Sequence, residues 1–303
     1  MVVPAPGKVT AARRARRAPV AAVTIATLGL SGCVTNVEKS TPNGWEPIRA
    51  DKVDEIAAMY DDDDGVLSIG VNPPFAPFQL KDADGQIVGL EMDLAHAVAD
   101  VLGLDFRIEE QDFAMILPAV QSGQIDMGVS GFTDTSDRRE NFDFVDTLYA
   151  GIQWTKRTDS SKEIDPHNPC GLTVAVQRTT VSDTDDVRPK AEACDGDMQV
   201  LAYDTADNAA LAVLMGRADA LSADSPAAGW AVNRSDGRLE LVGDISQAAP
   251  YGMAVPKGSE LGPAAAAALQ HLIDNGQYAE ILAQWGVEDG LVDEALINER
   301  PVK

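Results

Sequence analysis

The chain is poor in the residues on which much enzyme and metal chemistry depends. Its 303 residues include three cysteines and three histidines. No GxSxG, HExxH or phosphate-loop pattern occurs. His96, His167 and His271 stand outside the segments that carry the candidate binding residues described below. These absences argue against a catalytic function, and we expect no metal or other cofactor.

Basic residues are scarce relative to acidic ones. The chain has 24 lysines and arginines against 48 aspartates and glutamates, a formal net charge of −24. Residues 1–32 contain five of the basic residues and no acidic one, so the remainder is more acidic still. Such a charge repels nucleic acid and anionic lipid head groups and keeps a secreted protein soluble. Because 45% of the residues are hydrophobic, the chain can build a normal core and is not a disordered acidic tail.

The N-terminal apolar run is short. An uncharged run of 13 residues, Ala18–Leu30, follows four arginines, Arg13, Arg14, Arg16 and Arg17. A helix of this length cannot cross a bilayer core of about 30 Å, but it fits the core of a signal peptide. The run ends in Leu30-Ser31-Gly32-Cys33, which resembles the lipobox of bacterial lipoproteins, where the cysteine is lipidated and becomes the new N-terminus. We therefore expect a lipoprotein signal peptide at 1–32, lipidation of Cys33 and a tether at 33–64. An ordinary secretory signal with an incidental cysteine is the alternative.

The other two cysteines predict a disulfide. Cys170 and Cys194 form an even pair in a chain expected to leave the cytoplasm. The bond would close a loop of about 25 residues and stabilise the protein by roughly 3–4 kcal/mol in the chain-entropy model. A metal pair is the weaker alternative, because the nearest histidine, His167, follows a proline and is not at ligand spacing.

Strand and helix patterns alternate along the rest of the chain, which predicts an α/β fold. We expect strands at 66–71, 125–129, 172–177 and 219–223, and a turn at 82–85 between two further short strands. We expect helices at 92–102, 115–121, 207–215 and 263–285, the last broken at Asn275-Gly276. Residues 48–60 carry apolar side chains at helical spacing and predict one amphipathic helix.

Polar residues directly follow the predicted strand at 125–129. Ser130, Gly131 and Thr133 place hydroxyls and bare backbone at its C-terminal end, and Arg138 comes five residues after Thr133. In open α/β sheets, ligands bind at this end of the strands. Small donors and one planar guanidinium suit a carboxylate, since arginine can bond both oxygens at once. A solvated surface arginine is the alternative reading of Arg138.

Other strand ends supply complementary groups. Phe75 lies in the proline-rich loop after the first strand, and Phe113 opens the helix at 115–121. Asp224 follows the strand at 219–223, and Thr180 follows the strand at 172–177, where it could begin a helix that binds an anion. Together these residues offer a cation, an anion and two aromatic faces. Buried charges need partners, so the set suits a free amino acid. Core packing for the two rings, and a turn or capping role for Asp224, are the alternatives.

The chain resembles the solute-binding proteins of polar amino-acid ABC importers, the family of glutamine, histidine and lysine/arginine/ornithine receptors. The resemblance covers about residues 65–286 and rests on VLSIGVNPPFAPFQLKDADGQIVGLEMDLAHAVADVLGL, DFAMILPAVQSGQIDMGVSGFTDTSDRRENFDFVDTLYAGIQ, GRADALSADSP, PYGMAVPKGS and the terminal helix ending in Trp285-Gly286. It implies a two-lobed periplasmic-binding-protein-like fold of type II, with two crossing hinge strands near 149–154 and 248–251. Lobe 1 would then comprise 65–151 plus 250–303, and lobe 2 would comprise 152–249.

The resemblance also implies roles for individual residues. Phe75 and Phe113 would enclose the ligand side chain, Arg138 would bind its carboxylate, and Asp224 its ammonium. The implied ligand-binding residues in full are Asn72, Phe75, Phe113, Ser130, Gly131, Thr133, Arg138, Gln177, Thr180 and Asp224.

Three positions depart from the family pattern. Asn72 stands where several receptors for lysine, arginine or glutamine have an acid, which argues against a strongly cationic ligand side chain. Thr179 stands where many relatives have glycine, and Val181 stands where a threonine or glycine contact is common, so the register of that loop is open. Asp134 replaces an uncharged residue, with no evident reason in the sequence.

The function implied is that of a monomeric lipoprotein on the outer face of the cytoplasmic membrane. It would capture one polar amino acid and deliver it to the permease of an ABC importer, with no nucleic-acid partner. Two alternatives share the fold: an enzyme such as a cyclohexadienyl dehydratase, and a sensor module that binds an amino acid without transport.

Overall fold

A computed structural model describes residues 41–42, 44–61 and 64–301. The predicted signal peptide, Cys33 and the first part of the predicted tether lie outside these residues. Within the described part of the chain, no helix is long and apolar enough to cross a membrane.

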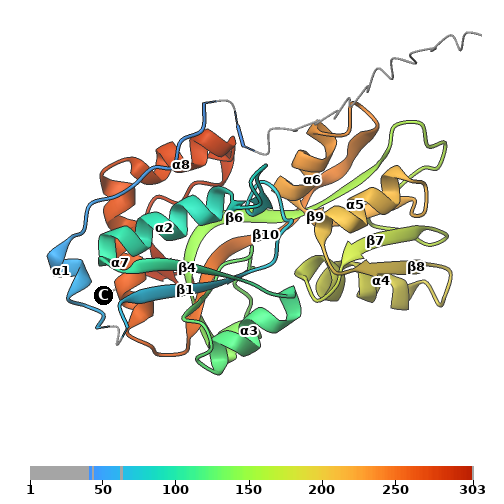
Figure 1. The fold of residues 1–303 in the computed structure, drawn as a ribbon. Helices are drawn as coiled ribbons and strands as arrows, with labels where there is room; N and C mark the ends of the chain where they lie inside the picture. The colour runs from blue at the N-terminus through green and yellow to red at the C-terminus, as the bar shows by residue number, and fades with distance from the viewer. Residues whose placement is uncertain (1–40, 43, 62–63, 302–303) are drawn as a thin grey trace, which may run out of the picture. The chain divides into compact units, whose positions relative to one another are not determined.

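One mixed sheet runs through the molecule with helices packed against it, which confirms the α/β prediction (Figure 1). Its strand order is β4-β1-β5-β10-β6-β9-β7-β8. These strands are β1 (Val66–Val71), β4 (Asp105–Glu110), β5 (Met127–Gly128), β6 (Phe142–Arg157), β7 (Thr173–Gln177), β8 (Gln199–Tyr203), β9 (Ala220–Asp224) and β10 (Leu239–Pro256). A separate hairpin of β2 (Leu80–Lys81) and β3 (Ile87–Val88) surrounds the predicted turn at 82–85.

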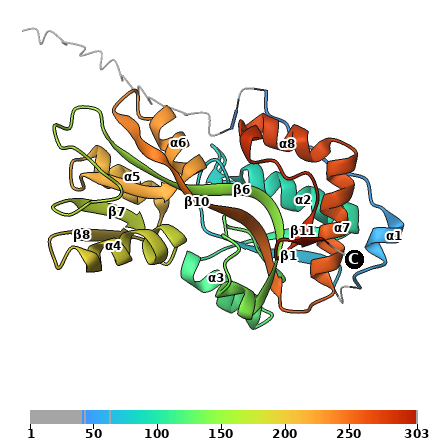
Figure 2. The same cartoon turned by 180° about the vertical axis from the view of Figure 1, so that it is seen from behind.

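Two long antiparallel strands, β6 and β10, pass from one lobe to the other (Figure 2). They are 16 and 18 residues long, far more than the roughly 5–6 residues of an ordinary strand. Their pairing shifts register around Ser246, between Val242 and Ala249, and again between Tyr251 and Gly252. These are the two crossing hinge strands that the sequence predicts, and the fold is the expected two-lobed type II architecture.

Lobe 1 contains the parallel strands β4, β1 and β5. Its helices are α2 (Leu90–Leu102), α3 (Phe113–Gln121), α7 (Leu261–Asp274) and α8 (Gln277–Trp285). Apolar residues of α2, α7 and α8 pack into one core with β1, including Leu94, Leu269 and Leu282. The predicted break between α7 and α8 is confirmed, because Gly276 adopts φ 87°, a left-handed conformation that glycine accepts without strain.

Lobe 2 contains the parallel strands β7, β8 and β9. Its helices are α4 (Arg188–Ala193), α5 (Ala206–Leu214) and α6 (Ser225–Asn233), preceded by a π-helical turn at Ser182–Val187. Cys170 and Cys194 form the predicted disulfide, with their Cα atoms 5.4 Å apart. The bond joins the loop before β7 to the end of α4.

The prediction of one helix over residues 48–60 is wrong. Only α1 (Asp54–Ala57) is helical, and the residues before it lie along lobe 1. Trp45 packs edge-on against Trp285, and both indole N–H groups donate to one Asp93 oxygen, at 2.7 and 2.8 Å. Arg49 forms an ion pair with Asp100 on α2. These contacts with the body replace the internal hydrogen bonds of a longer helix, so tertiary packing overrides the local pattern.

Candidate ligand-binding site

A small cavity lies where strand ends of the two lobes meet. Its volume is about 210 Å³, and it is lined by Asn72, Phe75, Phe113, Ser130, Gly131, Gln177, Thr180 and Asp224. All eight residues belong to the set implied by the sequence. An adjoining cavity of about 230 Å³ shares Phe75, Gln177, Thr180 and Asp224. Both are narrow in this conformation, in which the two lobes touch.

The parallel strands explain why these residues converge. Asn72 follows β1 directly, Ser130 lies two residues after β5, and Gln177 and Asp224 end β7 and β9. The carboxyl ends of β1 and β5 share one edge of the sheet, and those of β7 and β9 share the edge that faces them across the cavity. The site therefore takes its residues from both lobes.

Gly131 sits at the tightest point of the cavity wall. Its φ is +60°, and a Cβ atom there would lie 2.4 Å from a Phe75 ring carbon and 3.2 Å from Tyr251. No other residue fits without moving the Phe75 ring. The backbone can therefore approach a ligand closely at this position.

Behind Gly131 lies a buried hydrogen-bond network that sequence reasoning missed. The Gly131 N–H donates to both carboxylate oxygens of Glu91, at 3.0 and 3.1 Å. The Gln79 amide also donates to Glu91, and its carbonyl oxygen accepts from the Ser130 hydroxyl at 3.1 Å. The Ser130 Oγ in turn accepts from the Asn72 N–H at 3.2 Å. The sequence contained one signal for this network: Glu91 is an acidic residue between Leu90 and Met92, on the apolar side of α2.

A buried carboxyl group, Glu91, and a half-buried one, Asp224, give the site an excess of negative charge. Burial raises the pKa of Glu91 to about 7, against the hydrogen bonds from Gly131 and Gln79, and the Asp224 charge raises it further. Burial also raises the pKa of Asp224 to about 6, while the Tyr251 hydroxyl and the Arg138 charge oppose that shift. Each shift means that the carboxylate form lacks full compensation where it is buried.

Arg138 and Thr133 do not line the small cavity, although they adjoin it. The Arg138 Nη1 donates to the Thr133 carbonyl oxygen at 2.8 Å, and its guanidinium lies 5.5 Å from the Phe132 ring centroid. Burial lowers the pKa of Arg138, and the Asp224 carboxylate opposes this most strongly. The predicted cation and anion are therefore electrostatic neighbours. Thr133 forms a backbone bridge with Tyr251 of β10.

The loop after β7 leads into a helical turn close to the start expected at Thr180. Thr179 adopts φ 63°, and the helical turn begins later, at Ser182. Because left-handed φ favours glycine, this conformation explains why relatives can have glycine here. The Thr180 hydroxyl donates to the Gln177 carbonyl oxygen at 2.8 Å and accepts from the Asp183 N–H at 3.3 Å. The Thr180 carbonyl oxygen accepts from the Thr184 N–H at 2.9 Å, so Thr180 caps the helical turn. Thr180 lines the cavity and Val181 does not.

Two direct contacts cross between the lobes beside the cavity. The Gln177 amide donates to the Asn72 Oδ1 at 2.9 Å. Arg178 lies 2.5 Å from Asp112 of lobe 1 and also pairs with Asp204 of lobe 2. The conformation is thus one in which the lobes touch beside the predicted ligand position.

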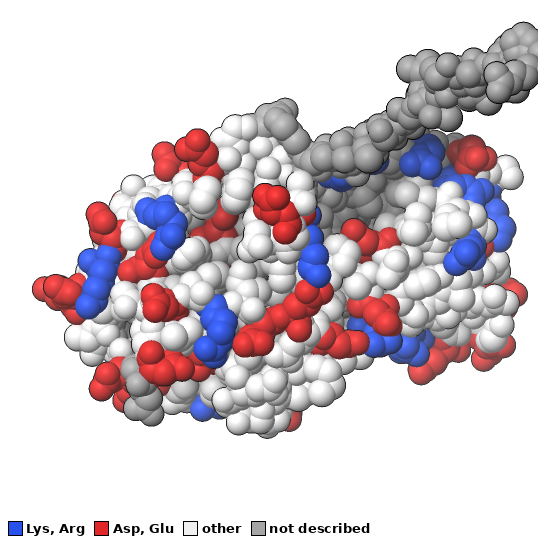
Figure 3. Space-filling model, in the orientation of Figure 1, with Lys and Arg blue, Asp and Glu red and all other residues white. Residues whose placement is uncertain are grey.

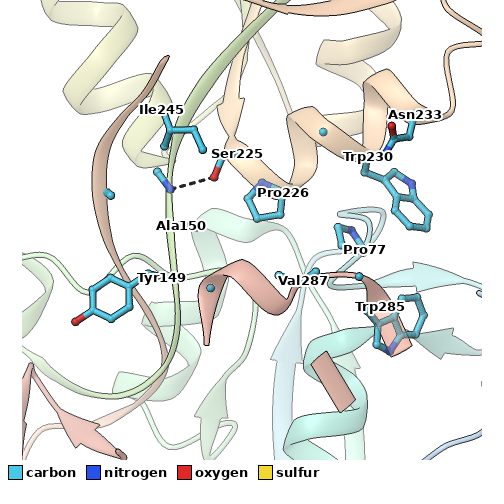
Figure 4. A pocket seen from close by; sticks show the side chains of 15 residues that line it. Pro77, Tyr149, Ala150, Ser225, Pro226, Trp230, Asn233, Ile245, Trp285 and Val287 are labelled. Atoms are coloured by element: carbon cyan, nitrogen blue, oxygen red, sulfur yellow. Dashed lines mark hydrogen bonds between the residues drawn. The ribbon is translucent and has the colours of Figure 1, made fainter. Parts of the chain in front are cut away.

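A larger cavity lies beside the hinge strands, as Figure 4 shows. It has a volume of about 1180 Å³ and is open to solvent on one side. Tyr149, Trp230, Ile245 and Trp285 line it, and the Gly151 N–H donates to the Ser225 Oγ at 3.2 Å. No lysine, arginine, histidine, aspartate or glutamate is among its lining residues. It cannot neutralise an ionic ligand, so the small cavity remains the candidate site.

Acidic side chains are spread over much of the surface, with basic ones between them (Figure 3). Within the described residues, no group of three histidine, cysteine, aspartate or glutamate side chains could hold a metal ion.

A profile of the bacterial extracellular solute-binding proteins, family 3, matches residues 67–288, and the chain belongs to this family. The matched range contains every lining residue of the small cavity.

The curated relatives bind amino acids. The chain is 59% identical over 280 residues to the arginine-binding protein ArgT of Corynebacterium glutamicum, covering 90% of this chain and 92% of that one. It is 30% identical over 233 residues to the L-arginine-binding protein of Pseudomonas aeruginosa, covering 72% of this chain and 86% of that one. It is also 30% identical over 257 residues to the glutamine-binding protein GlnH of Bacillus subtilis, covering 82% and 91%.

Solved structures agree with this family and fold. An ancestral arginine-binding protein bound to arginine matches with a TM-score of 0.69 and 32% identity, covering 73% of this chain and 98% of that one. An ancestral amino-acid-binding protein described as a precursor of cyclohexadienyl dehydratase matches with a TM-score of 0.66 and 29% identity, covering 77% and 98%. These proteins are named for binding, and the relationship to a dehydratase shows how near an enzyme can lie in this fold.

Proposed function

We propose that the chain binds free arginine between its two lobes and delivers it to the permease of an ABC importer. The observation that carries the proposal is the charge of the site. Glu91 is buried and Asp224 is half-buried, and their charges interact with each other, while the half-buried Arg138 is the basic neighbour of Asp224. Arginine brings two positive groups and one negative group, so every buried charge would gain a partner.

A neutral amino acid would satisfy the site less well. Its ammonium would pair with Asp224 and its carboxylate with Arg138, but Glu91 would keep no cationic partner. Glu91 would then have to retain a proton or remain an uncompensated buried charge, and either carries a free-energy cost. The names of the two arginine-binding relatives support the same choice.

The proposed pose assigns each end of arginine to a different part of the site. The α-carboxylate faces Arg138, and the α-ammonium faces Asp224. The aliphatic stem lies between Phe75 and Phe113. The guanidinium approaches the lobe 1 side of the cavity at Asn72, which Ser130 and Gln79 link to Glu91. Asn72 lacks the acid found in several cationic receptors, and Glu91 supplies that charge from the second layer instead.

Export, anchoring and lobe boundaries complete the proposal. The lipobox-like sequence supports a signal peptide at 1–32 and a lipid on Cys33, which would hold the protein as a monomer at the outer face of the cytoplasmic membrane. The paths of β6 and β10 support lobe 1 at 65–151 plus 250–303 and lobe 2 at 152–249. The names of the relatives support a receptor over the alternative of a cyclohexadienyl dehydratase, an enzyme that converts prephenate.

A thermal-shift screen against the twenty amino acids tests the proposal. A ligand that favours the folded, closed state raises the melting temperature by mass action. We expect L-arginine to give the largest shift, lysine a smaller one and glutamine the smallest of the three. A larger shift with glutamine would reject the choice of arginine, and turnover of prephenate would reject the choice of a receptor.

A further inference from the structure

The C-terminal hairpin ends in a turn that is fixed to β6. It consists of β11 (Leu296–Ile297) and β12 (Arg300–Pro301), joined by Asn298 and Glu299, whose φ values are 54° and 60°. Positive φ at both central residues is the geometry of a tight hairpin turn, which asparagine accepts well and glutamate does not. The Glu299 N–H donates to Asp146 at 2.8 Å. The Asn298 side chain bonds the Phe144 N–H at 3.0 Å, so the turn is held at both residues.

The Glu299 side chain contacts the segment that follows β5. Its carboxylate accepts from the Arg139 guanidinium at 2.5 Å. Arg139 also donates two hydrogen bonds to Asp134, at 2.5 and 2.9 Å. The Asp134 side chain has no exposed surface, and its N–H donates to the Pro250 carbonyl oxygen at 2.9 Å. A bidentate pair of this kind fixes both distance and orientation.

These contacts end one residue away from the proposed carboxylate-binding arginine. Arg138 and Arg139 are consecutive residues of the short 3₁₀ helix η1 (Arg138–Glu140). The loop before η1 is attached to β10 by the bridge between Thr133 and Tyr251, in which the Asp134 N–H donates to the Pro250 carbonyl oxygen and the Gly252 N–H donates to the Phe132 carbonyl oxygen, both at 2.9 Å. A shift of Arg139 would turn η1 and move Arg138 relative to Asp224.

We propose that Asp134, Arg139 and Glu299 are positioning residues that couple the C-terminal hairpin to the ligand-binding orientation of Arg138. The proposal rests on the proposed function, because it needs Arg138 to bind the ligand carboxylate. It explains Asp134, for which the sequence offered no reason. It also gives the hairpin at 296–301 a role in binding as well as in covering β6.

A second carboxyl group makes this arrangement sensitive to pH. Asp146 of β6 is buried and faces Asp134 of the loop, Arg139 of η1 and Glu299 of the hairpin. Burial, and then the Asp134 charge, raise the pKa of the Asp146 carboxyl well above its usual range, against the Glu299 N–H and the Arg139 charge. When Asp146 loses its proton, a second anion stands beside Asp134 and competes for Arg139. Raising the pH should therefore weaken the fixed orientation of η1.

The test compares affinity with stability in purified variants of the full chain. Asp134→Asn and Arg139→Lys are titrated calorimetrically with L-arginine, beside Glu294→Gln as a control. Glu294 is an exposed glutamate five residues before Glu299, with no hydrogen bond or ion pair to any described residue. We expect Kd to rise about tenfold in Asp134→Asn, about fivefold in Arg139→Lys and not at all in the control. Arg139→Lys keeps the cation and folds even if Asp134→Asn does not. A lower melting temperature with an unchanged Kd in the folded variants would reduce these residues to structural supports and overturn the proposal.

The pH dependence gives a readout that a structural role would not change. Between pH 6 and pH 9, wild-type affinity should fall relative to Asp146→Asn, because the amide cannot become an anion. Parallel profiles for the two proteins would also overturn the proposal. If the wild type binds a different amino acid in the thermal-shift screen, the same comparison is made with that ligand, so only the choice of arginine fails. If it binds none, both proposals fail.

Discussion

The two lobes contribute differently to the same cavity. On the lobe 1 side, Ser130 and Gly131 belong to a buried network with Gln79 and Glu91 that exists without reference to lobe 2. On the lobe 2 side, Asp224 stands at the end of β9. Burial raises its pKa to about 6, and the groups that oppose this shift, the Tyr251 hydroxyl and the Arg138 charge, lie outside lobe 2. Lobe 1 therefore holds a preformed surface, whereas the charge of lobe 2 is compensated only when the lobes approach.

This difference indicates an order of events in binding. A ligand can first meet the rigid lobe 1 surface, and closure about β6 and β10 then brings Asp224 to it. A ligand stabilises the closed form only as far as it contacts that form better than the open one. The ion pair between the ligand ammonium and Asp224 is such a contact. The predictions below therefore separate the contribution of charge pairing from that of the preformed lobe 1 surface.

Removing either opposed charge should have the largest effect. Arg138→Ala and Asp224→Ala each leave a buried partner without compensation, which costs about 3–5 kcal/mol, or at least a hundredfold in Kd. Calorimetry with L-arginine measures the loss. Glu294→Ala, at the exposed glutamate used above as a control, should bind normally. A change of less than threefold in either site variant would remove that residue from the site.

Glu91→Gln should come next and should change selectivity. The amide keeps the size of the side chain and one acceptor for the Gly131 N–H, but it loses the charge and the second acceptor, which the Gln79 amide uses. Losing one charged partner is worth roughly 1.5–3 kcal/mol, about tenfold or more in the Kd for arginine. Binding of glutamine should change by less than threefold. Equal losses for both ligands would show that Glu91 supports the Gly131 loop without selecting for charge.

The pH profile should separate ligand binding from folding. The raised pKa values are about 6 for Asp224 and about 7 for Glu91. A bound cation favours both carboxylates, so arginine affinity should rise from pH 5 to pH 8 by up to about tenfold per pH unit for each protonated carboxyl, apart from the Asp146 effect. The folding stability of the ligand-free protein should follow the opposite trend with pH. Folded pKa values above the unfolded ones mean that stability is lost as pH rises from about 4 to 7. Calorimetry and urea denaturation over this range would show whether the two trends diverge, and parallel trends would contradict the assignment.

Arg178→Ala should have the smallest effect. Arg178 joins Asp112 of lobe 1 to Asp204 of lobe 2, but all three side chains are well exposed. Exposed ion pairs contribute about 0–1 kcal/mol, so Kd should rise less than about fivefold. The increase should lie in the dissociation rate, because the contact exists only with the lobes together. Stopped-flow dissociation measures it, and a hundredfold change would place closure, not charge pairing, at the centre of affinity.

The sequence predicts the architecture and the cavity lining better than it predicts the layer behind the lining. Strand ends place Asn72, Ser130, Gln177 and Asp224 together, because the period of apolar residues locates the strands and the sheet brings their ends to one edge. The role of Glu91 could not be read in the same way. Its importance depends on α2 packing behind Gly131, a contact between residues forty positions apart.

Two further features also depend on tertiary contacts. The short α1 reflects contacts of Trp45 and Arg49 with lobe 1, which no local pattern records. Asp134 looked anomalous because its partners lie at Arg139 and, through it, at Glu299 near the C-terminus.

The most direct measurement compares L-arginine with L-citrulline, which keeps the shape of arginine but replaces the guanidinium with a neutral urea group. Both ligands are titrated into the wild-type protein at pH 7.5 under identical salt. We predict that arginine binds at least about a hundredfold more tightly, because only its guanidinium compensates the second buried acid. Citrulline affinity within threefold of that for arginine would contradict the charge-pairing basis of the site.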